Sequence, residues 1–365
     1  MWIRLLMKNF YPIAFVLAAL LIGGCDEPYP MDSVSSLAKE TYTVGDTSYL
    51  EISPPITGFL APSVLYVGND NLLYVVDSTR IVMMNFAGIM MGERSIDKPS
   101  AIAQDWKLDL IVGGVVQRNT GGATTEVPAL FRIHLLDSTR QIYHDLAHAY
   151  IDTIRVETSR PNRRYVGIGV FPDNSYIVAR TGPDNSSPID PDTRVMMFSK
   201  ADKYVTPITD LATGVGNGIQ YINQLTTLIT FPSSRNFLLG QQQTGVAYGV
   251  LWMIYQKSED FDGWQPKFNP TTSSGANIDF IRPYRFVYPA GLAVDNNRLD
   301  VFVADAGLDS VMKFNSKGAF KKESFGSAKI GHPLHPSGAA FFDRTLYISD
   351  KSQGCIFRFK LSTDF

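Results

Sequence analysis

Cysteine is nearly absent from this sequence, since only Cys25 and Cys355 occur among its 365 residues. A fold held together by several disulfide bonds is therefore excluded, and a chain of this length buries enough apolar surface to do without them. Cys355 stands in an alternating run of apolar and polar residues. A small buried side chain is a simpler interpretation there than a reactive thiol.

Positive charge is not in excess either. The 33 Lys and Arg residues are outnumbered by 35 Asp and Glu residues, which gives a formal net charge of −2 at pH 7. Proteins that bind nucleic acid normally show a basic stripe or patch. We therefore expect no nucleic-acid partner.

The sequence also lacks an apolar run long enough to cross a bilayer, which takes roughly 20 residues. The run over residues 13–22 follows the basic residues Arg4 and Lys8 and ends in two glycines before Cys25. A charged start, a short apolar core and small residues at its end indicate an export signal. This end resembles the lipobox of bacterial lipoproteins, and the resemblance implies cleavage before Cys25 and acylation of its thiol.

These features divide the chain into a lipoprotein signal peptide (1–24), a lipidated flexible tether (25–45) and a folded domain (46–365). Asp26 and Glu27 resemble a sorting signal that retains lipoproteins at the inner membrane in some bacteria and exports them to the cell surface in others. An uncleaved N-terminal anchor, with Cys25 incidental, is the alternative. In both cases we expect an extracytoplasmic domain held to the membrane of the bacterial cell envelope, on its periplasmic or cell-surface face.

Self-similarity is the most informative feature of the remaining chain. The clearest unit covers residues 289–326 and contains four short apolar segments, each closed by Asp, Asn or Gly. Such segments are typical of strands joined by tight turns, and four of them form one antiparallel sheet that is too small to bury both of its faces. Further copies, clear in the first two and weaker in the last three, begin at Pro336, Pro62, Pro99, Tyr165 and Leu225.

Residues 289–295 and 299–305 carry the pattern Pro-x-Gly-apolar-Ala-apolar-Asp followed by an apolar run that ends in Ala-Asp. This unit resembles the NHL repeat. The resemblance implies an all-β fold, a six-bladed β-propeller of four-stranded antiparallel sheets in which each sheet packs against its two neighbours. The last unit offers only three strands before the chain ends, and we expect residues 47–52 to supply the fourth and close the ring.

The middle units carry extra residues, at 119–128 and 181–192 between second and third strands and at 145–164, 211–224 and 266–288 between sheets. Both kinds of connection emerge on the same face of a propeller. Long loops on one face of a rigid scaffold are where binding is usually built, so we expect this face to carry the function. The alternative is that these loops are insertions that the fold tolerates and that have no function.

The end of the second strand differs among the units. It is Asp in three of them, at positions 77, 305 and 350, and Gly114, Arg180 and Gln241 in the middle three. The carboxylate of an Asp at a turn accepts hydrogen bonds from backbone N–H groups, whereas the guanidinium of an Arg can only donate hydrogen bonds. We therefore expect Arg180 to face a ligand, together with Arg118 beside the neighbouring insertion and Gln241 at the equivalent position.

Aromatic and cationic residues also gather before the fifth unit, where Arg282, Tyr284 and Arg285 follow Trp264. Aromatic faces beside planar donors suit sugars or anionic groups. Packing of the connection between sheets is the alternative. We include these four residues among the candidates for binding.

Enzymes with NHL-like propellers usually place a metal over the central channel, so the resemblance directs attention to the histidines. His332 and His335 are candidate ligands for Zn or Ca, but a catalytic zinc site has three protein ligands. Neither a Gly-x-Ser-x-Gly nor a His-Glu-x-x-His motif occurs. The sequence thus favours a binding or scaffold module for an envelope protein or glycan, without cofactor or catalytic residues, and a metal-dependent lyase or hydrolase is the alternative.

Overall fold

A computed structural model describes residues 47–120, 122–275 and 279–365 of the chain. The signal peptide, the tether and Cys25 lie outside the described residues. Within the described part, no helix is both long and apolar enough to cross a membrane.

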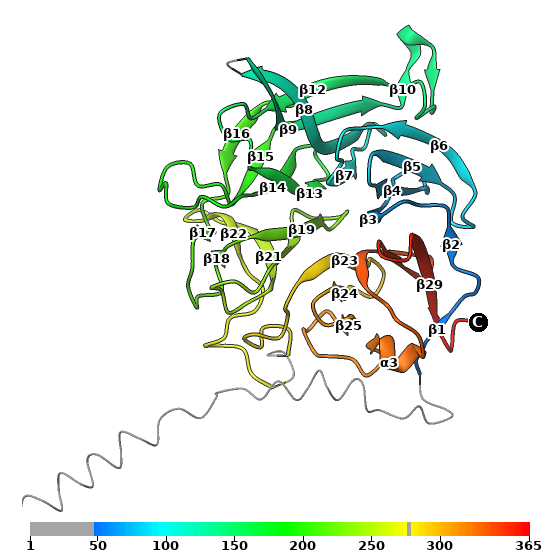
Figure 1. The fold of residues 1–365 in the computed structure, drawn as a ribbon. Helices are drawn as coiled ribbons and strands as arrows, with labels where there is room; N and C mark the ends of the chain where they lie inside the picture. The colour runs from blue at the N-terminus through cyan, green and yellow to red at the C-terminus, as the bar shows by residue number, and fades with distance from the viewer. Residues whose placement is uncertain (1–46, 121, 276–278) are drawn as a thin grey trace, which may run out of the picture. The chain divides into compact units, whose positions relative to one another are not determined.

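The described chain is an all-β ring of six four-stranded antiparallel sheets, which confirms the predicted six-bladed propeller (Figure 1). Blades 1 to 3 follow each other along the chain, and in each the first strand lies next to the central axis. Their strands are β3 (Pro62–Val67), β4 (Leu73–Asp77), β5 (Arg80–Met84) and β6 (Met90–Ser95); β7 (Ala101–Gln104), β8 (Leu110–Thr120), β9 (Ala123–His134) and β12 (Tyr150–Val156); and β13 (Arg164–Val170), β14 (Tyr176–Thr181), β15 (Arg194–Phe198) and β16 (Tyr204–Pro207).

Blades 4 to 6 continue the ring in the same way. Their strands are β19 (Leu225–Thr230), β20 (Phe237–Gln241), β21 (Val250–Lys257) and β22 (Asp262–Pro266); β23 (Pro289–Asp295), β24 (Asp300–Asp305), β25 (Ser310–Phe314) and β26 (Phe325–Gly326); and β27 (Pro336–Phe342), β28 (Thr345–Asp350), β29 (Cys355–Leu361) and β1 (Tyr49–Glu51). Smaller elements outside this scheme are β2 (Ile56–Thr57), the hairpin β10–β11 (Leu136–Asp137, Ile142–Tyr143), the pair β17–β18 (Ala212–Thr213, Tyr221–Ile222) and the short helices η2 (Ser138–Arg140) and α3 (Ser327–Ile330).

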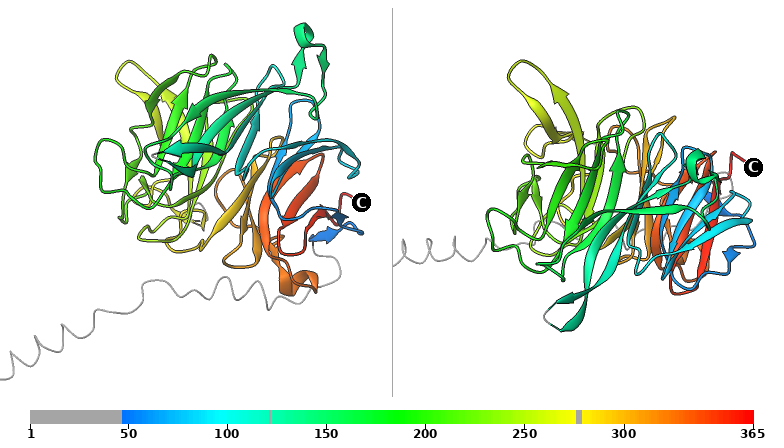
Figure 2. Two further views of the ribbon diagram at one scale, coloured as in Figure 1. Left: turned by 45° about the horizontal axis from the view of Figure 1, so that its top comes forward. Right: turned by 90° about the horizontal axis from the view of Figure 1, so that it is seen from above.

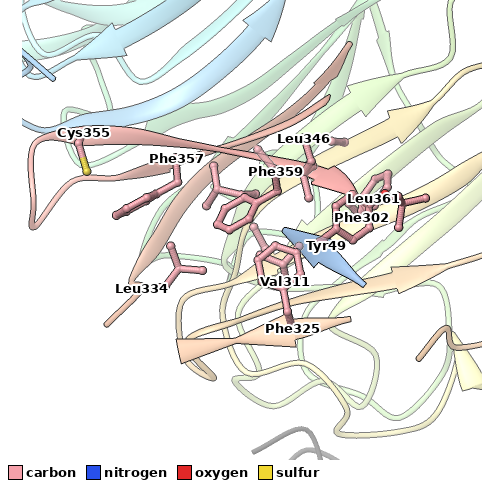
Figure 3. Close-up of a cluster of buried hydrophobic side chains, with 14 residues drawn as sticks. Tyr49, Phe302, Val311, Phe325, Leu334, Leu346, Cys355, Phe357, Phe359 and Leu361 are labelled. Atoms are coloured by element: carbon pink, nitrogen blue, oxygen red, sulfur yellow. The ribbon is translucent and has the colours of Figure 1, made fainter. Parts of the chain in front are cut away.

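The ring closes through the N-terminal strand, as the sequence predicted. β1 pairs with β29 in an antiparallel register that sets Tyr49 opposite Leu361. The Tyr49 ring is buried and lies edge-on to Phe302 of blade 5 at 5.8 Å, among the aromatic side chains shown in Figure 3. Burial of one such side chain stabilises the fold by roughly 2 kcal/mol, so a three-residue strand joins blade 6 firmly to blade 5.

The inner strands approach each other so closely that they exclude side chains at some positions. A Cβ atom on Gly291 would lie 2.5 Å from the backbone nitrogen of Ala339 in the next blade, and one on Gly167 would lie 2.5 Å from that of Leu228. Five of the six inner strands also begin with a β-bulge or register shift. The units are therefore repeated in structure as well as in sequence. The close approach of the inner strands leaves a narrow central channel.

The propeller has two different faces. On the connection face the inner strands begin, and second strands connect to third strands and each blade to the next. On the turn face the inner strands end, and first strands connect to second strands and third strands to fourth. The long hairpin β8–β9 projects from the connection face, and the hairpin β21–β22 projects to the opposite side (Figure 2).

Candidate functional site

The Asp residues at the ends of the second strands accept backbone amides, as we interpreted them, and they bind the segment that enters the blade as well as the local turn. Asp77 accepts the backbone amides of Leu60 and Ala61 through Oδ1, at 2.9 and 2.7 Å. Asp305 accepts those of Val287, Tyr288 and Gly307, and Asp350 those of His335, Ser352 and Gln353. Each fully buried carboxylate thus fixes the segment that leads into the inner strand of its own blade.

Gln241 performs the same task in blade 4 without a charge. Its Oε1 accepts the amide of Asn223 at 2.8 Å, and its Nε2 donates to the carbonyl oxygens of Tyr221 and Tyr248. The side chain is fully buried. Gln241 therefore has a local structural role, and the prediction that it contacts a ligand has no support in this geometry.

In blade 2 the equivalent position is Gly114, which has no side chain to bind the entering segment. A Cβ atom there would lie 2.9 Å from the carbonyl oxygen of Asp97, so the connecting segment packs directly against the strand. The second strand then continues past this point. The predicted loop at 119–128 is wrong, because β8 and β9 pair without interruption from Leu110 and Ile133 to Thr120 and Ala123.

Blade 3 differs most, because Arg180 lies in the interior of the protein with an exposed fraction of 1 %. Its guanidinium donates to Glu157 and Asp190 and to the carbonyl oxygens of Pro191 and Asp192. The segment 181–192 folds back over the arginine. We expected Arg180 to face a ligand, but in the structure its N–H groups donate to oxygen atoms of the protein itself.

Arg163 extends this cluster, in which both arginines, Glu157 and Asp192 are buried, whereas the side chain of Asp190 is 51 % exposed. It donates to Glu157 at 2.8 Å, to Asp190 at 2.8 Å and to Asp192 at 2.7 Å. Burial raises the pKa of Asp190, but hydrogen bonds from Arg180 and Arg163 outweigh it and lower that pKa to about 2. The pKa of Glu157 is also lowered, since the nearby arginines outweigh its burial. We call Glu157, Arg163, Arg180, Asp190 and Asp192 the blade-3 ion cluster.

A pocket lies on the outer side of the same loop, between blades 3 and 4 on the connection face. Its volume is about 530 Å³. The buried side chains Val195, Ile208 and Leu211 form apolar lining, while Ser187 and Arg194 add polar groups. We call it the blade 3–4 pocket, and it is our candidate functional site.

Arg194 is the one charged side chain among the described residues that line this pocket. One Nη donates to the carbonyl oxygen of Ile189 at 2.8 Å, and the other lies 3.9 Å from Asp190. The side chain is 18 % exposed. The sequence did not single it out, because Arg194 begins a strand like many other charged residues, and only folding of the 181–192 segment turns it into a pocket wall.

The remaining candidates do not come together. Arg118 is exposed near the tip of the β8–β9 hairpin, paired in register with Thr125. Trp264 is buried and donates to the carbonyl oxygen of Arg235 at the turn between the first two strands of blade 4, which lies on the turn face. These residues belong to opposite sides of the ring.

The segment before blade 5 is mixed in character. Arg285 is buried over the rings of Phe314 and Phe320, and burial lowers its pKa to about 10. Tyr284 is 42 % exposed and its hydroxyl lies 3.5 Å from Asn217, while Arg282 is half-buried. Arg285 therefore packs the segment that connects blades 4 and 5, in agreement with the packing alternative and not with ligand binding.

His332 and His335 do not converge on a common point. His332 Nε2 lies 2.6 Å from Glu51, whereas His335 Nδ1 lies 2.9 Å from Asp309. Across the described ranges no group of three His, Cys, Asp or Glu side chains is arranged to hold a metal ion. The donors present do not fit the Zn or Ca site of the alternative hypothesis.

Comparison with known proteins supports the fold alone. No family model matches the chain, and no curated protein matches its sequence. A gluconolactonase from Xanthomonas campestris is similar in structure, with a TM-score of 0.53 and 13% identity over 87% of this chain and 90% of its own. An auxiliary nutrient binding protein from Bacteroides thetaiotaomicron gives 0.53 and 11% over 83% and 70%.

A third similar structure is the PQQ-bound aldose sugar dehydrogenase from Streptomyces coelicolor, with a TM-score of 0.54 and 12% identity over 87% of this chain and 99% of its own. The three neighbours include enzymes and a binding protein. Propellers of this class therefore host both kinds of function, and the site has to decide between them. The NHL resemblance stays a prediction.

Proposed function

We propose that this chain is a lipoprotein of the bacterial cell envelope whose propeller binds an envelope protein or glycan through its connection face. The blade 3–4 pocket carries this proposal. It is built from segments that blades 1, 5 and 6 lack, and its volume of about 530 Å³ is within the range that suits a bound sugar residue or a short peptide segment.

The pocket wall is rigid, which favours binding. The segment 184–192 is closed on itself by hydrogen bonds between Asp184 and Asp192, and Arg163 and Arg180 tie it to Glu157 from beneath. A wall fixed in advance loses little conformational entropy when a ligand binds. The interior arginines thus support the site without touching the ligand.

The lining indicates the chemistry of the ligand. Apolar side chains form one part of the surface, and the Arg194 guanidinium offers donors beside the hydroxyl groups of Ser187 and Thr209. Planar arginine donors suit carboxylates. We therefore expect a ligand with an apolar face and a carboxylate, as in an acidic sugar or an acidic peptide segment.

The turn-face end of the central channel gives no support to the enzymatic alternative. Apolar, amide and hydroxyl side chains line it, and no Asp, Glu, His, Lys or Arg is among the described residues there. Acid–base chemistry or metal binding at that end of the channel would have no carboxylate, imidazole or amine to use. A binding function needs no such group.

Site-specific photocrosslinking tests the connection face. A photoreactive amino acid replaces Thr209 in the pocket or, as the matched control, Lys200, which is exposed in a turn of blade 3 on the turn face. We expect a covalent adduct in cells from position 209 and none from 200. Arg194→Ala should lower the adduct yield, whereas Arg298→Ala on the turn face should not. Equal adducts from both positions would refute a specific connection face.

Anchoring is tested separately through Cys25. We expect Cys25→Ser to abolish labelling by a fatty acid and to leave an uncleaved precursor or a protein released from the membrane. Cys355→Ser is the matched control, because Cys355 is buried in blade 6. Unchanged processing and labelling of Cys25→Ser would contradict the lipobox.

A further inference from the structure

The turn face has an open well at the end of the central channel. The ends of all six inner strands and the following turns of blades 1, 2, 4 and 5 line it, and its volume is about 120 Å³. Deeper in the ring the free space falls to about 20 Å³, between side chains such as Ile102, Ile168 and Leu228. The well therefore has a floor, and a ligand enters it from the turn face alone. We call it the channel well.

The lining of the channel well is apolar at depth and carries no charge. Leu65, Ile229 and Leu292 contribute aliphatic groups from three blades. Among the described lining residues there is no Asp, Glu, His, Lys or Arg, and burial raises the pKa of Tyr66 to about 12, so its hydroxyl stays neutral. A charged compound would lose its hydration there without gaining a partner.

Trp106 forms a fixed aromatic wall at the rim. Its backbone amide donates to Asn174 at 2.8 Å, and its indole nitrogen donates to the carbonyl oxygen of Phe171 at 3.1 Å. Both donors are thus held by blade 3, yet 46 % of the side chain is exposed. A large aromatic face that is rigid and open to solvent is prepared for stacking.

Two amide side chains complete the rim. Asn69 donates through Nδ2 to the carbonyl oxygens of Gln104 and Asp105, and its Oδ1 accepts no hydrogen bond within the described part of the chain. Asn296 is exposed, and its side-chain amide has no hydrogen-bond partner in the same part. The rim therefore offers an acceptor oxygen on each of the two amides and N–H donors on Asn296, and both kinds of group suit a hydroxyl.

We propose that the channel well binds a neutral ring compound that carries a hydroxyl group, with the ring in the apolar well beside Trp106 and the hydroxyl at the amide side chains of the rim. The size agrees, since a cavity of about 150 Å³ is enough for benzene and this well is open on one side. The proposal concerns the turn face and is independent of the connection face.

Ligand-observed NMR with two small probes tests the charge requirement. p-Cresol and p-toluate share a methyl-substituted ring, but the first is a neutral hydroxyl compound and the second is an anion. We expect p-cresol to bind the purified protein at least about tenfold more tightly, because the well cannot pair a carboxylate. Equal binding of the two probes, or no binding of p-cresol, overturns the proposal.

Variants then locate the binding. Trp106→Ala should weaken p-cresol binding by about tenfold through loss of the stacking wall, and Asn296→Ala should weaken it by about threefold through loss of one hydrogen bond. Val67→Phe adds a ring to the half-buried wall and should abolish binding while leaving Trp106 in place. Tyr143→Ala removes an aromatic side chain that is 70 % exposed elsewhere, and it should change nothing. An equal loss in Tyr143→Ala, or no loss in Trp106→Ala and Val67→Phe, overturns the assignment.

Discussion

Blades 1, 5 and 6 and blades 2 to 4 solve one structural problem in different ways. Asp77, Asp305 and Asp350 end the second strands of the first group and bind backbone amides of the segments that enter the same blade. In the second group, Arg180 binds the inserted segment 181–192 and Gln241 binds the segment before blade 4, whereas Gly114 packs against the segment that enters blade 2. The insertions of blades 3 and 4 are therefore integrated into the scaffold, whereas the extended hairpin of blade 2 projects from it.

The largest effect should follow from breaking the blade-3 ion cluster. Arg180→Ala leaves Glu157 buried beside one fewer cation, and removal of one partner from a buried pair costs about 3–5 kcal/mol of the free energy of unfolding. Chemical denaturation measures it. Arg118→Ala, on the exposed hairpin, should change stability by less than about 0.5 kcal/mol. Similar small effects in both variants would show that the cluster does not support blade 3.

A smaller effect should follow from charging the amide of blade 4. Gln241→Glu keeps the shape but directs a carboxylate oxygen at the carbonyl oxygens of Tyr221 and Tyr248. We expect a loss of about 2–3 kcal/mol, since two donated hydrogen bonds become repulsive. The same change at the exposed Gln220 should be nearly neutral. If Gln241→Glu unfolds like the original protein, blade 4 accepts the carboxylate that blades 1, 5 and 6 use.

The smallest expected effect is a difference in how the stability of two variants depends on pH, one in each group of blades. The pKa of Asp190 is lowered to about 2, so its contribution to stability is present above the ordinary Asp pKa near 4 and is lost as the pH falls toward 2. Burial raises the pKa of Asp305, so protonation of Asp305 favours the folded state in the acid range. We therefore expect Asp190→Asn to flatten the fall of the melting temperature between about pH 4 and pH 2.5. Asp305→Asn should not flatten it. An unchanged pH profile in Asp190→Asn contradicts the assigned ion pairs.

The same division explains what could be predicted from the sequence. Blades 1, 5 and 6 consist of short strands closed by Asp, Asn or Gly, and their pattern predicts the sheets and the closing strand. The β8–β9 hairpin escaped prediction because residues 117–126 are polar on both sides and show no alternation. Such a hairpin projects beyond the core, so no hydrophobic periodicity marks it.

The candidate site was harder to predict because its parts come from separate segments. The partners of Arg180 are Glu157 and Asp190, 23 residues before and 10 residues after it. Spacing alone gives no indication that these three side chains meet, with Arg180 and Glu157 in the interior and Asp190 partly exposed at its edge. Arg180 indeed accepts no hydrogen bond from a backbone N–H group. Its guanidinium donates to carboxylates and carbonyl oxygens of the protein and not to a ligand.

The short strand β1 has a mechanical consequence. It is the first described strand of the chain and the outermost strand of blade 6, so tension applied to the preceding segment arrives at the seam of the ring before any other blade. Three backbone pairs, the buried Tyr49 ring and the contact between Glu51 and His332 carry that load. In a protein tethered through its N-terminus, these few contacts would determine how much force the propeller bears before it opens.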